Sequence, residues 1–392
     1  MSEDHYERSL IVHRQLRGKL GIISKLPIND CDALSLAYTP GVARPCEEIA
    51  KDKSLARTLT IKGNSVAVVS DGSAVLGLGN IGPEAAIPVM EGKAILFKEF
   101  ANIDAWPICL DTQDAEAIVS TVRAIAPVFG GINLEDISAP RCFEIEERLQ
   151  DLGIPVFHDD QHGTAIVLLA ALINACKVTN RQMTSLRVVI NGAGAAGTAI
   201  AKLLRCINFD PRLCESVKEL VVCDSRGAIH SGRTDLNDSK KEILNFTNRG
   251  DRVGSLKEVL VGMDVFIGVS KADLLNGDDI KSMADDPIIF AMANPVPEIM
   301  PDLARDAGAG VVGTGRSDFP NQVNNLLAFP GVFRGALDAG ATRVTDKMKL
   351  AAAIALAAST EDVSAEQVLP NPLDRHVAPL VAAAVQKAFR EL

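Results

Sequence analysis

Three glycines constrain the fold most, because they lie between a predicted strand and a predicted helix. The strand Leu186–Asn191 ends at Gly192, and the apolar-periodic helix Ala196–Leu204 follows it. In this G-x-G-x-x-G spacing, Gly192 permits a tight turn, Gly194 lets a pyrophosphate approach the backbone, and Gly197 lets helix and strand pack closely. The pattern predicts a dinucleotide-binding unit, and the alternative is a glycine-rich structural turn.

An acidic residue after the next predicted strand supports the dinucleotide interpretation. The strand Leu220–Cys223 ends on Asp224, which lies further from the glycines than the usual ~20 residues because of a polar insert at Phe209–Glu215. Asp224 suits the ribose 2′-hydroxyl of NAD, whereas Arg226 suits the 2′-phosphate of NADP. We therefore predict NADP, with NAD as the alternative. The candidate cofactor-binding residues of this region are Gly192, Gly194, Ala195, Ala196, Gly197, Asp224 and Arg226.

Strand and helix patterns alternate in two sections of the 392 residues, which predicts α/β architecture with parallel sheets. Polar, helical sequence precedes them up to about residue 60. We expect one α/β domain over 1–160 and a Rossmann-type domain with C-terminal helices over 161–392. The first section has predicted strands at Val66–Ser70, Pro107–Leu110, Ile132–Leu134 and Pro155–His158 and predicted helices at Pro83–Phe97, Asp114–Ala126 and Pro140–Leu152. The second has strands at Leu186–Asn191, Leu220–Cys223, Asp264–Val269, Ile288–Ala293 and Gly310–Val312 and helices at Thr164–Cys176, Lys347–Ala358 and after Pro379.

Composition and charge exclude several classes of protein. A net charge of -10 with a pI of about 5.2 argues against a nucleic-acid partner. The longest apolar run, Ala165–Cys176, is interrupted by Asn174 and is shorter than the ~20 residues of a membrane span. The acidic N-terminus lacks the apolar core of a secretory signal. The 8 cysteines include no C-x-x-C pair, so we expect reduced thiols and a cytoplasmic protein.

Each strand of the first section is followed by acid, and parallel strands bring such residues to one rim. Asp71 and Asp111 follow singly, and we interpret them as helix caps. The doublets Glu135-Asp136 and Asp159-Asp160 are harder to explain by capping. Clustered carboxylates need a cation to stay ionised, and hard oxygen ligands suit Mg²⁺ or Mn²⁺. His158 and His162 flank the second doublet, and we leave both outside the metal shell.

Several segments together resemble malic enzymes of the short bacterial type. The resemblance runs from about residue 36 to about residue 350 in the family's order. It implies oxidative decarboxylation of L-malate to pyruvate and CO₂ with NAD(P)⁺, a divalent metal and a homodimer. The matching segments are Tyr38-Thr39-Pro40-Gly41-Val42-Ala43, Ser70-Asp71-Gly72-Ser73 with Gly77-Leu78-Gly79, Pro88-Val89-Met90-Glu91-Gly92-Lys93, Ile132-Asn133-Leu134-Glu135-Asp136, His158-Asp159-Asp160-Gln161-His162-Gly163-Thr164-Ala165, Ala293-Asn294-Pro295, and Gly315-Arg316-Ser317-Asp318 with Asn324-Asn325.

The same resemblance implies roles for individual residues. Lys93 corresponds to the general base, Tyr38 to the general acid, and Asp159 to the acid that contacts the base. Burial and the metal's charge would lower the pKa of Lys93 from its ordinary ~10.4, and Asp159 would oppose that. Without the resemblance, Lys93 would be a surface lysine and Tyr38 a turn residue. The implied metal ligands are Glu135, Asp136 and Asp160, the implied residues near substrate and nicotinamide are Asn294 and Asn325, and Asn324 is a cofactor contact or a helix cap.

The chain departs from the malic enzyme pattern at one position, and three other functions remain as alternatives. Long eukaryotic-type relatives carry an arginine for the substrate carboxylate where this chain has Ala74, which leaves the group holding the distal carboxylate undetermined. A malolactic enzyme would use bound NAD and release lactate. An amino-acid-type dehydrogenase with Lys93 as base would not need the acid doublets. A nucleotide-sensing binding protein would not need the complete set of acid, base and metal residues.

Overall fold

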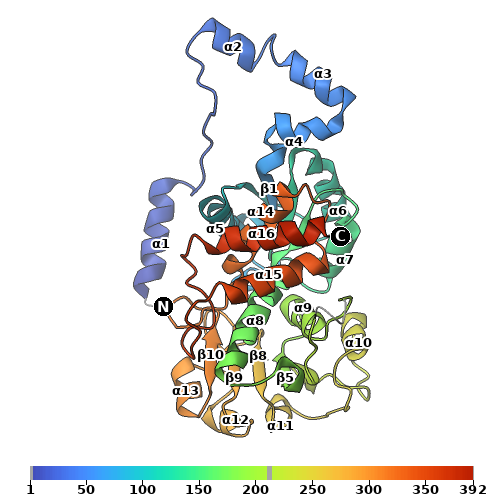
Figure 1. Cartoon of the computed structure of the whole chain (residues 1–392), viewed down its shortest axis with the longest axis vertical. Helices are drawn as coiled ribbons and strands as arrows, with labels where there is room; N and C mark the ends of the chain where they lie inside the picture. Colours follow the sequence, from blue (N-terminus) through green and yellow to red (C-terminus); the bar gives the residue numbers. More distant parts are fainter. Residues whose placement is uncertain (1–2, 210–213, 392) are drawn as a thin grey trace.

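The computed structural model describes residues 3–209 and 214–391, which form two α/β units on either side of a long helix (Figure 1). The first unit has a sheet in the order β2-β1-β3-β4 with all neighbours parallel, as predicted. Its strands are β1 (Ser65–Ser70), β2 (Asp104–Cys109), β3 (Gly131–Leu134) and β4 (Val156–His158). Its helices are α5 (Pro83–Ala101), α6 (Ala115–Ile125) and α7 (Arg141–Leu149).

The second unit has the strand order of a Rossmann fold, β10-β9-β8-β5-β6-β7. The two-residue strand β7 pairs antiparallel with β6 and is too short to leave a sequence pattern. The strands are β5 (Arg187–Asn191), β6 (Glu219–Asp224), β7 (Gly227–Ala228), β8 (Val265–Gly268), β9 (Ile288–Ala291) and β10 (Val311–Thr314). The helices are α9 (Ala195–Leu204), α10 (Asp238–Leu244), α11 (Leu256–Leu260), α12 (Gly277–Lys281) and α13 (Pro301–Asp306).

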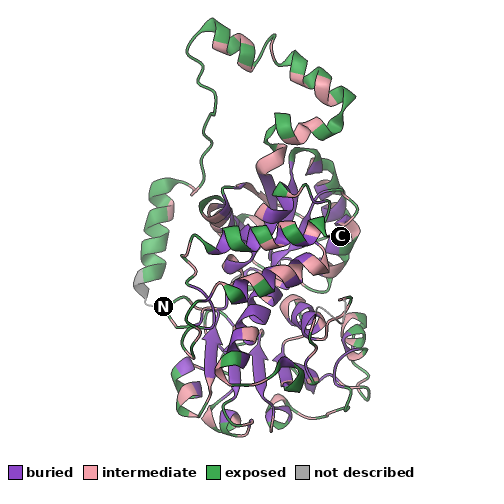
Figure 2. Cartoon of the chain, in the orientation of Figure 1, coloured by how far each residue is buried: buried purple, intermediate pink, exposed green. Residues whose placement is uncertain are grey.

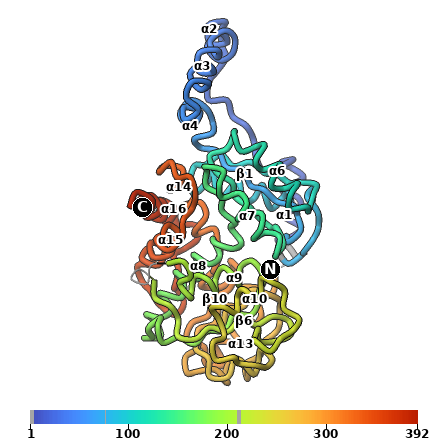
Figure 3. Tube along the Cα trace, turned by 90° about the vertical axis from the view of Figure 1, so that its right-hand side faces the viewer, coloured from blue at the N-terminus to red at the C-terminus, as the bar shows by residue number. Residues whose placement is uncertain are grey.

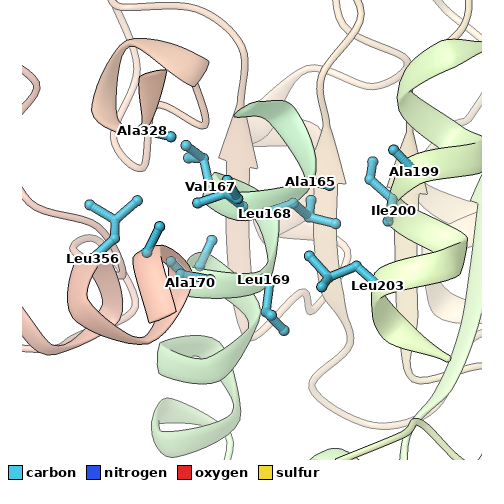
Figure 4. Packing of buried hydrophobic residues seen from close by; sticks show 14 of the residues in the cluster. Ala165, Val167, Leu168, Leu169, Ala170, Ala199, Ile200, Leu203, Ala328 and Leu356 are labelled. Atoms are coloured by element: carbon cyan, nitrogen blue, oxygen red, sulfur yellow. The ribbon is translucent and has the colours of Figure 1, made fainter. Parts of the chain in front are cut away.

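The helix α8 (Asp159–Val178) joins the two units and is the centre of the largest core. Figure 4 shows its apolar side chains packed against Ile200 and Leu203 of α9 on one side and Leu356 on the other. By length and composition α8 could cross a membrane, but 72% of its most apolar window is buried in the protein. Asn174, which interrupts the apolar run, donates to the carbonyls of Ala357 and Val368. The apolarity of α8 is therefore used in packing.

The C-terminal helices are α14 (Phe329–Asp338), α15 (Asp346–Ala358) and α16 (Val377–Arg390). Although α14 follows the Rossmann sheet in the chain, it packs against α5 of the first unit. The ring of Phe97 lies 4.7 Å from that of Phe329 and 5.3 Å from that of Phe333, which also contacts Phe157. Each such ring contributes about 1.5–3 kcal/mol by burial. The predicted boundary at 160/161 falls in the first turn of α8, the helix between the two sheets, while α14 returns to the first unit.

The N-terminal segment contains α1 (Glu3–Leu16), α2 (Cys31–Ala37), α3 (Ala43–Lys51) and α4 (Ala56–Leu59), in agreement with the predicted helical character. Helices α2 and α3 stand away from both units in the two views (Figures 1 and 3). Neither helix has a buried residue, and Figure 2 shows them mostly in green. Leu34 and Leu36 are 51% and 66% exposed, so this arm has an apolar surface that the described residues leave uncovered.

The expectation of reduced cysteines is wrong for one pair, because a disulfide joins Cys206 and Cys214. Cys206 precedes the predicted polar insert, Cys214 lies within it, and their Cα atoms are 5.8 Å apart. Their separation of 8 residues resembles no C-x-x-C motif and gave no signal in the sequence. Residues 210–213 of the insert lie outside the described residues. The other six cysteines are free.

Candidate active site

Three carboxylates meet at the carboxyl ends of β3 and β4. Glu135, Asp136 and Asp160 each offer an oxygen, and these oxygens lie within 4.8 Å of one another. Glu135 and Asp136 are 4% and 5% exposed, whereas the side chain of Asp160 is 31% exposed and opens the group to solvent. Hard, converging oxygens of this kind fit Mg²⁺ or Mn²⁺. The structure brings together all three residues predicted as metal ligands.

Local backbone geometry explains how the acids converge. Asp136 adopts a left-handed φ of 54°, and its N–H donates to Oδ2 of Asp160 at 2.8 Å. Its carbonyl accepts from the N–H of Ala74 at 2.9 Å, which ties the loop after β1 to the loop after β3. Helix α8 begins at Asp159, earlier than predicted, so both acids of the second doublet lie in its first turn. Anionic side chains at the N-terminus of a helix are stabilised by the helix dipole.

Lys93 on α5 lies in the middle of these acids and is 7% exposed. Its Nζ donates to Oδ2 of Asp159 at 2.6 Å and lies 2.8 Å from Oε1 of Glu135. The ammonium also lies 4.3 Å from the ring centre of Phe329. The interpretation of Lys93 as a surface lysine is therefore wrong. The predicted contact between Lys93 and Asp159 is present.

The charges of the cluster oppose one another. Burial alone would lower the pKa of Lys93, but the charges of Asp159, Glu135 and Asp160 outweigh burial and hold the pKa above its ordinary value. Burial raises the pKa of Glu135 and of Asp160, because few cations compensate them. The expected lowering of the pKa of Lys93 is therefore not produced by the protein's own groups. A divalent cation fits this uncompensated negative charge.

The other residues of the rim do not join the three-carboxylate group. Asp71 accepts from the N–H and hydroxyl of Ser73 and from Arg141, so it closes its own turn. Asp111 is exposed. His158 is fully buried, its Nδ1 lies 3.8 Å from Asp160, and within the described chain neither ring nitrogen has a hydrogen-bond partner. His162 contacts Glu146 on α7 instead.

The glycine-rich turn has the geometry expected of a pyrophosphate site. Gly192 has a φ of 129°, and a Cβ there would lie 2.7 Å from the carbonyl oxygen of Val269. A Cβ at Gly197 would lie 1.8 Å from the carbonyl oxygen of Gly192, whereas one at Gly194 would meet open space. Helix α9 begins at Ala195 without a side-chain cap. Its first N–H groups, which include that of Ala196, are thus available to an anion.

A cavity of about 290 Å³ extends from this turn to the acid that ends β6, and it is lined by Ala139, Pro140, Phe143, Ala193, Gly194, Asp224, Asn237, Ser239 and Lys240. Asp224 accepts from Arg233 at 2.8 and 3.0 Å and from Nζ of Lys240 at 2.6 Å. Arg226 instead directs its guanidinium to Asp235 at 3.1 Å, and its side chain is 71% exposed. Sequence reasoning missed Arg233 and Lys240, whose only signal was their positive charge after Asp224.

The three asparagines occupy different places. Asn294 is exposed at the end of β9, and its peptide bond to Pro295 is cis. Asn324 accepts from the N–H of Leu326 and caps a short 3-10 helix, as the capping alternative expects. Asn325 approaches the acids, because a Cβ at Gly163 would lie 3.1 Å from its Cβ and 1.8 Å from Oδ1 of Asp159.

Tyr38 lies outside this cluster. It ends the exposed helix α2 and is itself 68% exposed. Within the described residues, no hydrogen bond links its hydroxyl to Lys93 or to the acids. The predicted base and acid are therefore not brought together by a single chain.

Fold and site together define a dinucleotide-dependent dehydrogenase with a buried lysine beside a group of carboxylates. The family model described as the malic enzyme N-terminal domain matches residues 17–150. That described as the malic enzyme NAD-binding domain matches residues 161–305 and 308–389. The chain belongs to the malic enzyme family.

Individual relatives are similar in sequence to this chain over nearly its whole length. A bifunctional malic/malolactic enzyme of Bacillus subtilis (strain 168) is 58% identical, with 98% of this chain and 93% of the relative covered. An NAD-dependent malic enzyme of Geobacillus stearothermophilus is 53% identical, with 97% and 78% covered. The crystal structure of an NAD-dependent malic enzyme from Thermotoga maritima superposes with a TM-score of 0.92 at 49% identity, with 96% of this chain and 98% of that chain covered. An NADP-dependent malic enzyme of Rhizobium meliloti (strain 1021) is 46% identical, with 98% and 52% covered.

Proposed function

We propose that this chain catalyses the oxidative decarboxylation of L-malate to pyruvate and CO₂ with reduction of NAD(P)⁺. The observation that carries the proposal is the buried Lys93, 2.6 Å from Asp159 and beside the three-carboxylate group. In its neutral form, Nζ of Lys93 would take the proton of the C2 hydroxyl while the C2 hydride passes to the nicotinamide ring. Loss of CO₂ from the resulting oxaloacetate leaves an enolate, and protonation of its C3 gives pyruvate.

Glu135, Asp136 and Asp160 would hold the metal. A bound divalent cation would act as a Lewis acid on the substrate's C2 oxygen and stabilise the charge of the enolate. The proposal is tested by Asp160→Asn, which removes one negative charge at nearly constant volume. Asp111→Asn, at an exposed rim acid, is the control. Asp160→Asn should weaken Mn²⁺ binding and Asp111→Asn should not, while EDTA should abolish turnover of the wild type. Full activity of the EDTA-treated protein would overturn the metal proposal.

We propose that Tyr38 donates the proton to C3 and that it does so in the site of a second copy of the chain. The exposed arm around α2 and the absence of a described contact with Lys93 in its own chain support this arrangement. Lys93→Ala and Tyr38→Phe should each be inactive as homodimers. Mixed dimers should regain part of the activity, since one of their two sites would have both residues. Mixtures that stay inactive after subunit exchange would contradict the arrangement.

The residues around the cavity beside Asp224 bear on the choice between NAD and NADP. Lys240 lines that cavity and carries a positive charge next to the carboxylate, which favours NADP, whereas Asp224 itself favours NAD. Arg226 remains a candidate phosphate contact, but its partner is Asp235. Both an NAD-dependent relative, 53% identical, and an NADP-dependent relative, 46% identical, match nearly the whole chain. The direct experiment is to supply malate and Mn²⁺ with NAD⁺ or NADP⁺ separately and to follow absorbance and pyruvate.

A second candidate function is conversion of malate to lactate and CO₂ with bound NAD. The observation that favours it is the name of the Bacillus subtilis relative, a bifunctional malic/malolactic enzyme. The two reactions differ in the fate of the hydride, which either leaves as NAD(P)H or returns to pyruvate. Lactate formed without accumulation of NAD(P)H would support the malolactic reaction. For the protein itself we propose a cytoplasmic homodimer that acts on a small molecule, without nucleic acid or membrane.

A further inference from the structure

Glu146 is a buried carboxylate that the proposed mechanism does not use. It lies on α7, is 9% exposed, and faces the point at which β4 ends and the first turn of α8 begins. Oε1 accepts from the N–H of His158 at 3.1 Å, and Oε2 accepts from Nε2 of Gln161 at 3.1 Å. Nε2 of His162 lies 2.9 Å from Oε1 and 3.0 Å from Oε2. One carboxylate thus binds three residues within a five-residue segment.

That segment carries two of the proposed functional acids. Asp159 and Asp160 lie between the residues that Glu146 binds, in the first turn of α8. The residue before the helix, His158, offers no side-chain cap to its free N–H groups. Glu146, on a different helix, instead binds the backbone N–H of His158 just before α8 and the side chains of Gln161 and His162 within its first turn. Asp159 contacts Lys93 and Asp160 accepts from the N–H of Asp136 in the same turn that Glu146 contacts from α7.

The charge of Glu146 is maintained at neutral pH. Burial works to raise its pKa, but the nearby charges of His162, Lys349 and His158 and the hydrogen bond from His162 outweigh burial and lower the pKa to about 2. Lys349 on α15 completes this environment, with Nζ 3.5 Å from Nε2 of His162. Charged acceptors make stronger hydrogen bonds than neutral ones. The ionised carboxylate is thus suited to holding the turn in one conformation.

We propose that Glu146 is a positioning residue that holds the turn at 158–162 so that Asp159 meets the base lysine and Asp160 meets the metal. This inference rests on the proposed function. It assigns Glu146 no contact with substrate, cofactor or metal. Groups that orient metal ligands from behind typically change metal affinity or activity 10–100-fold when they are removed.

The surroundings of Glu146 allow its removal without loss of the fold. A cavity of about 840 Å³ adjoins Glu146, Gln161, His162 and Lys349, so water can reach the groups that a truncation would leave unpaired. Glu146→Ala is thus expected to remain folded with the turn at 158–162 released. Glu146→Gln retains an acceptor and nearly the same volume, and it tests whether geometry suffices. Glu147→Ala is the matched control, because Glu147 is exposed on the same helix.

The experiment measures the Mn²⁺ affinity of the full chain from the electron paramagnetic resonance signal of free Mn²⁺, without malate. Cofactor affinity and kcat are measured separately with Mn²⁺ present, and Tm is measured in EDTA. Glu146→Ala should weaken Mn²⁺ binding by about 10–100-fold and lower kcat, with cofactor affinity unchanged. Glu146→Gln should recover most of the Mn²⁺ affinity, and Glu147→Ala should match the wild type. A lower Tm for Glu146→Ala with unchanged Mn²⁺ affinity would overturn the positioning role. Failure of the wild type to bind Mn²⁺ would instead overturn the proposed metal site itself, and with it this inference.

Discussion

Oδ2 of Asp159 lies 2.6 Å from Nζ of Lys93, while Oδ1 of Asp159 has no hydrogen-bond partner among the described residues. Asp159 is fully buried, so its carboxylate is committed to the lysine. An acid in this position orients the amine and also favours the ammonium form. A base at this site therefore gains orientation from Asp159, but a smaller fraction of the lysine is in the neutral form that can accept a proton.

Asp159→Asn is expected to separate these two effects. The substitution removes a charge that raises the pKa of Lys93, so Lys93 should lose its proton at lower pH. The ascending limb of the pH profile of kcat/KM for malate should then move to lower pH. The maximal rate should fall, because the amide holds the amine less firmly. An unchanged ascending limb, measured with saturating Mn²⁺, would show that another group titrates there.

The crowding around Asp159 leads to a second prediction. A Cβ at Gly163 would lie 1.8 Å from Oδ1 of Asp159, so Gly163→Ala must displace that carboxylate. Glycine to alanine inside a helix otherwise favours folding by up to about 1 kcal/mol. Gly163→Ala should lower kcat strongly with a small change in Tm. Gly92→Ala in α5 is the control, since its Cβ would meet only Nζ of Lys19 at 3.7 Å, and it should remain active. Normal activity of Gly163→Ala would show that Asp159 can move freely.

The sequence predicted the sheets and the acid cluster because both follow from local patterns. Strand–helix alternation indicated parallel sheets, and the acids after β3 and β4 had to meet because parallel strands end at one rim. The burial of Lys93 and the return of α14 to the first unit depend on contacts between distant segments, which no local pattern encodes. The strand β7, which pairs antiparallel with β6, was missed because two residues are too few to form a recognisable strand pattern. The exposed place of Tyr38 was missed because it depends on where the helical arm lies in space, which no local pattern encodes.

The cations around Asp224 predict how cofactor specificity can be changed. Lys240 lines the cavity beside Asp224, whereas the exposed Arg226 is bound to Asp235. Lys240→Ala should therefore raise KM for NADP⁺ by about 10–100-fold, the equivalent of a charge-assisted hydrogen bond, and change KM for NAD⁺ less. Arg226→Ala should have the smaller effect on KM for NADP⁺. The reverse order in initial-rate measurements would assign the phosphate contact to Arg226.

The lowered pKa of Asp224 predicts that the free energy of unfolding depends on pH, whether or not a metal is bound. Burial works to raise its pKa, but hydrogen bonds from Arg233 and Lys240 outweigh burial and lower the pKa from 3.8 to about 2. Because the folded-state pKa lies below the unfolded value, the stabilisation is complete above about pH 4 and is lost as the pH falls towards 2. Asp224→Asn should reduce the urea midpoint most near pH 7, and its difference from the wild type should narrow between pH 4 and pH 3. Asp238→Asn is the control, since the Asp238 side chain is 99% exposed, and its midpoint should match the wild type throughout. A difference for Asp224→Asn that stays constant from pH 7 to pH 3 would show that the carboxylate's charge does not stabilise the fold.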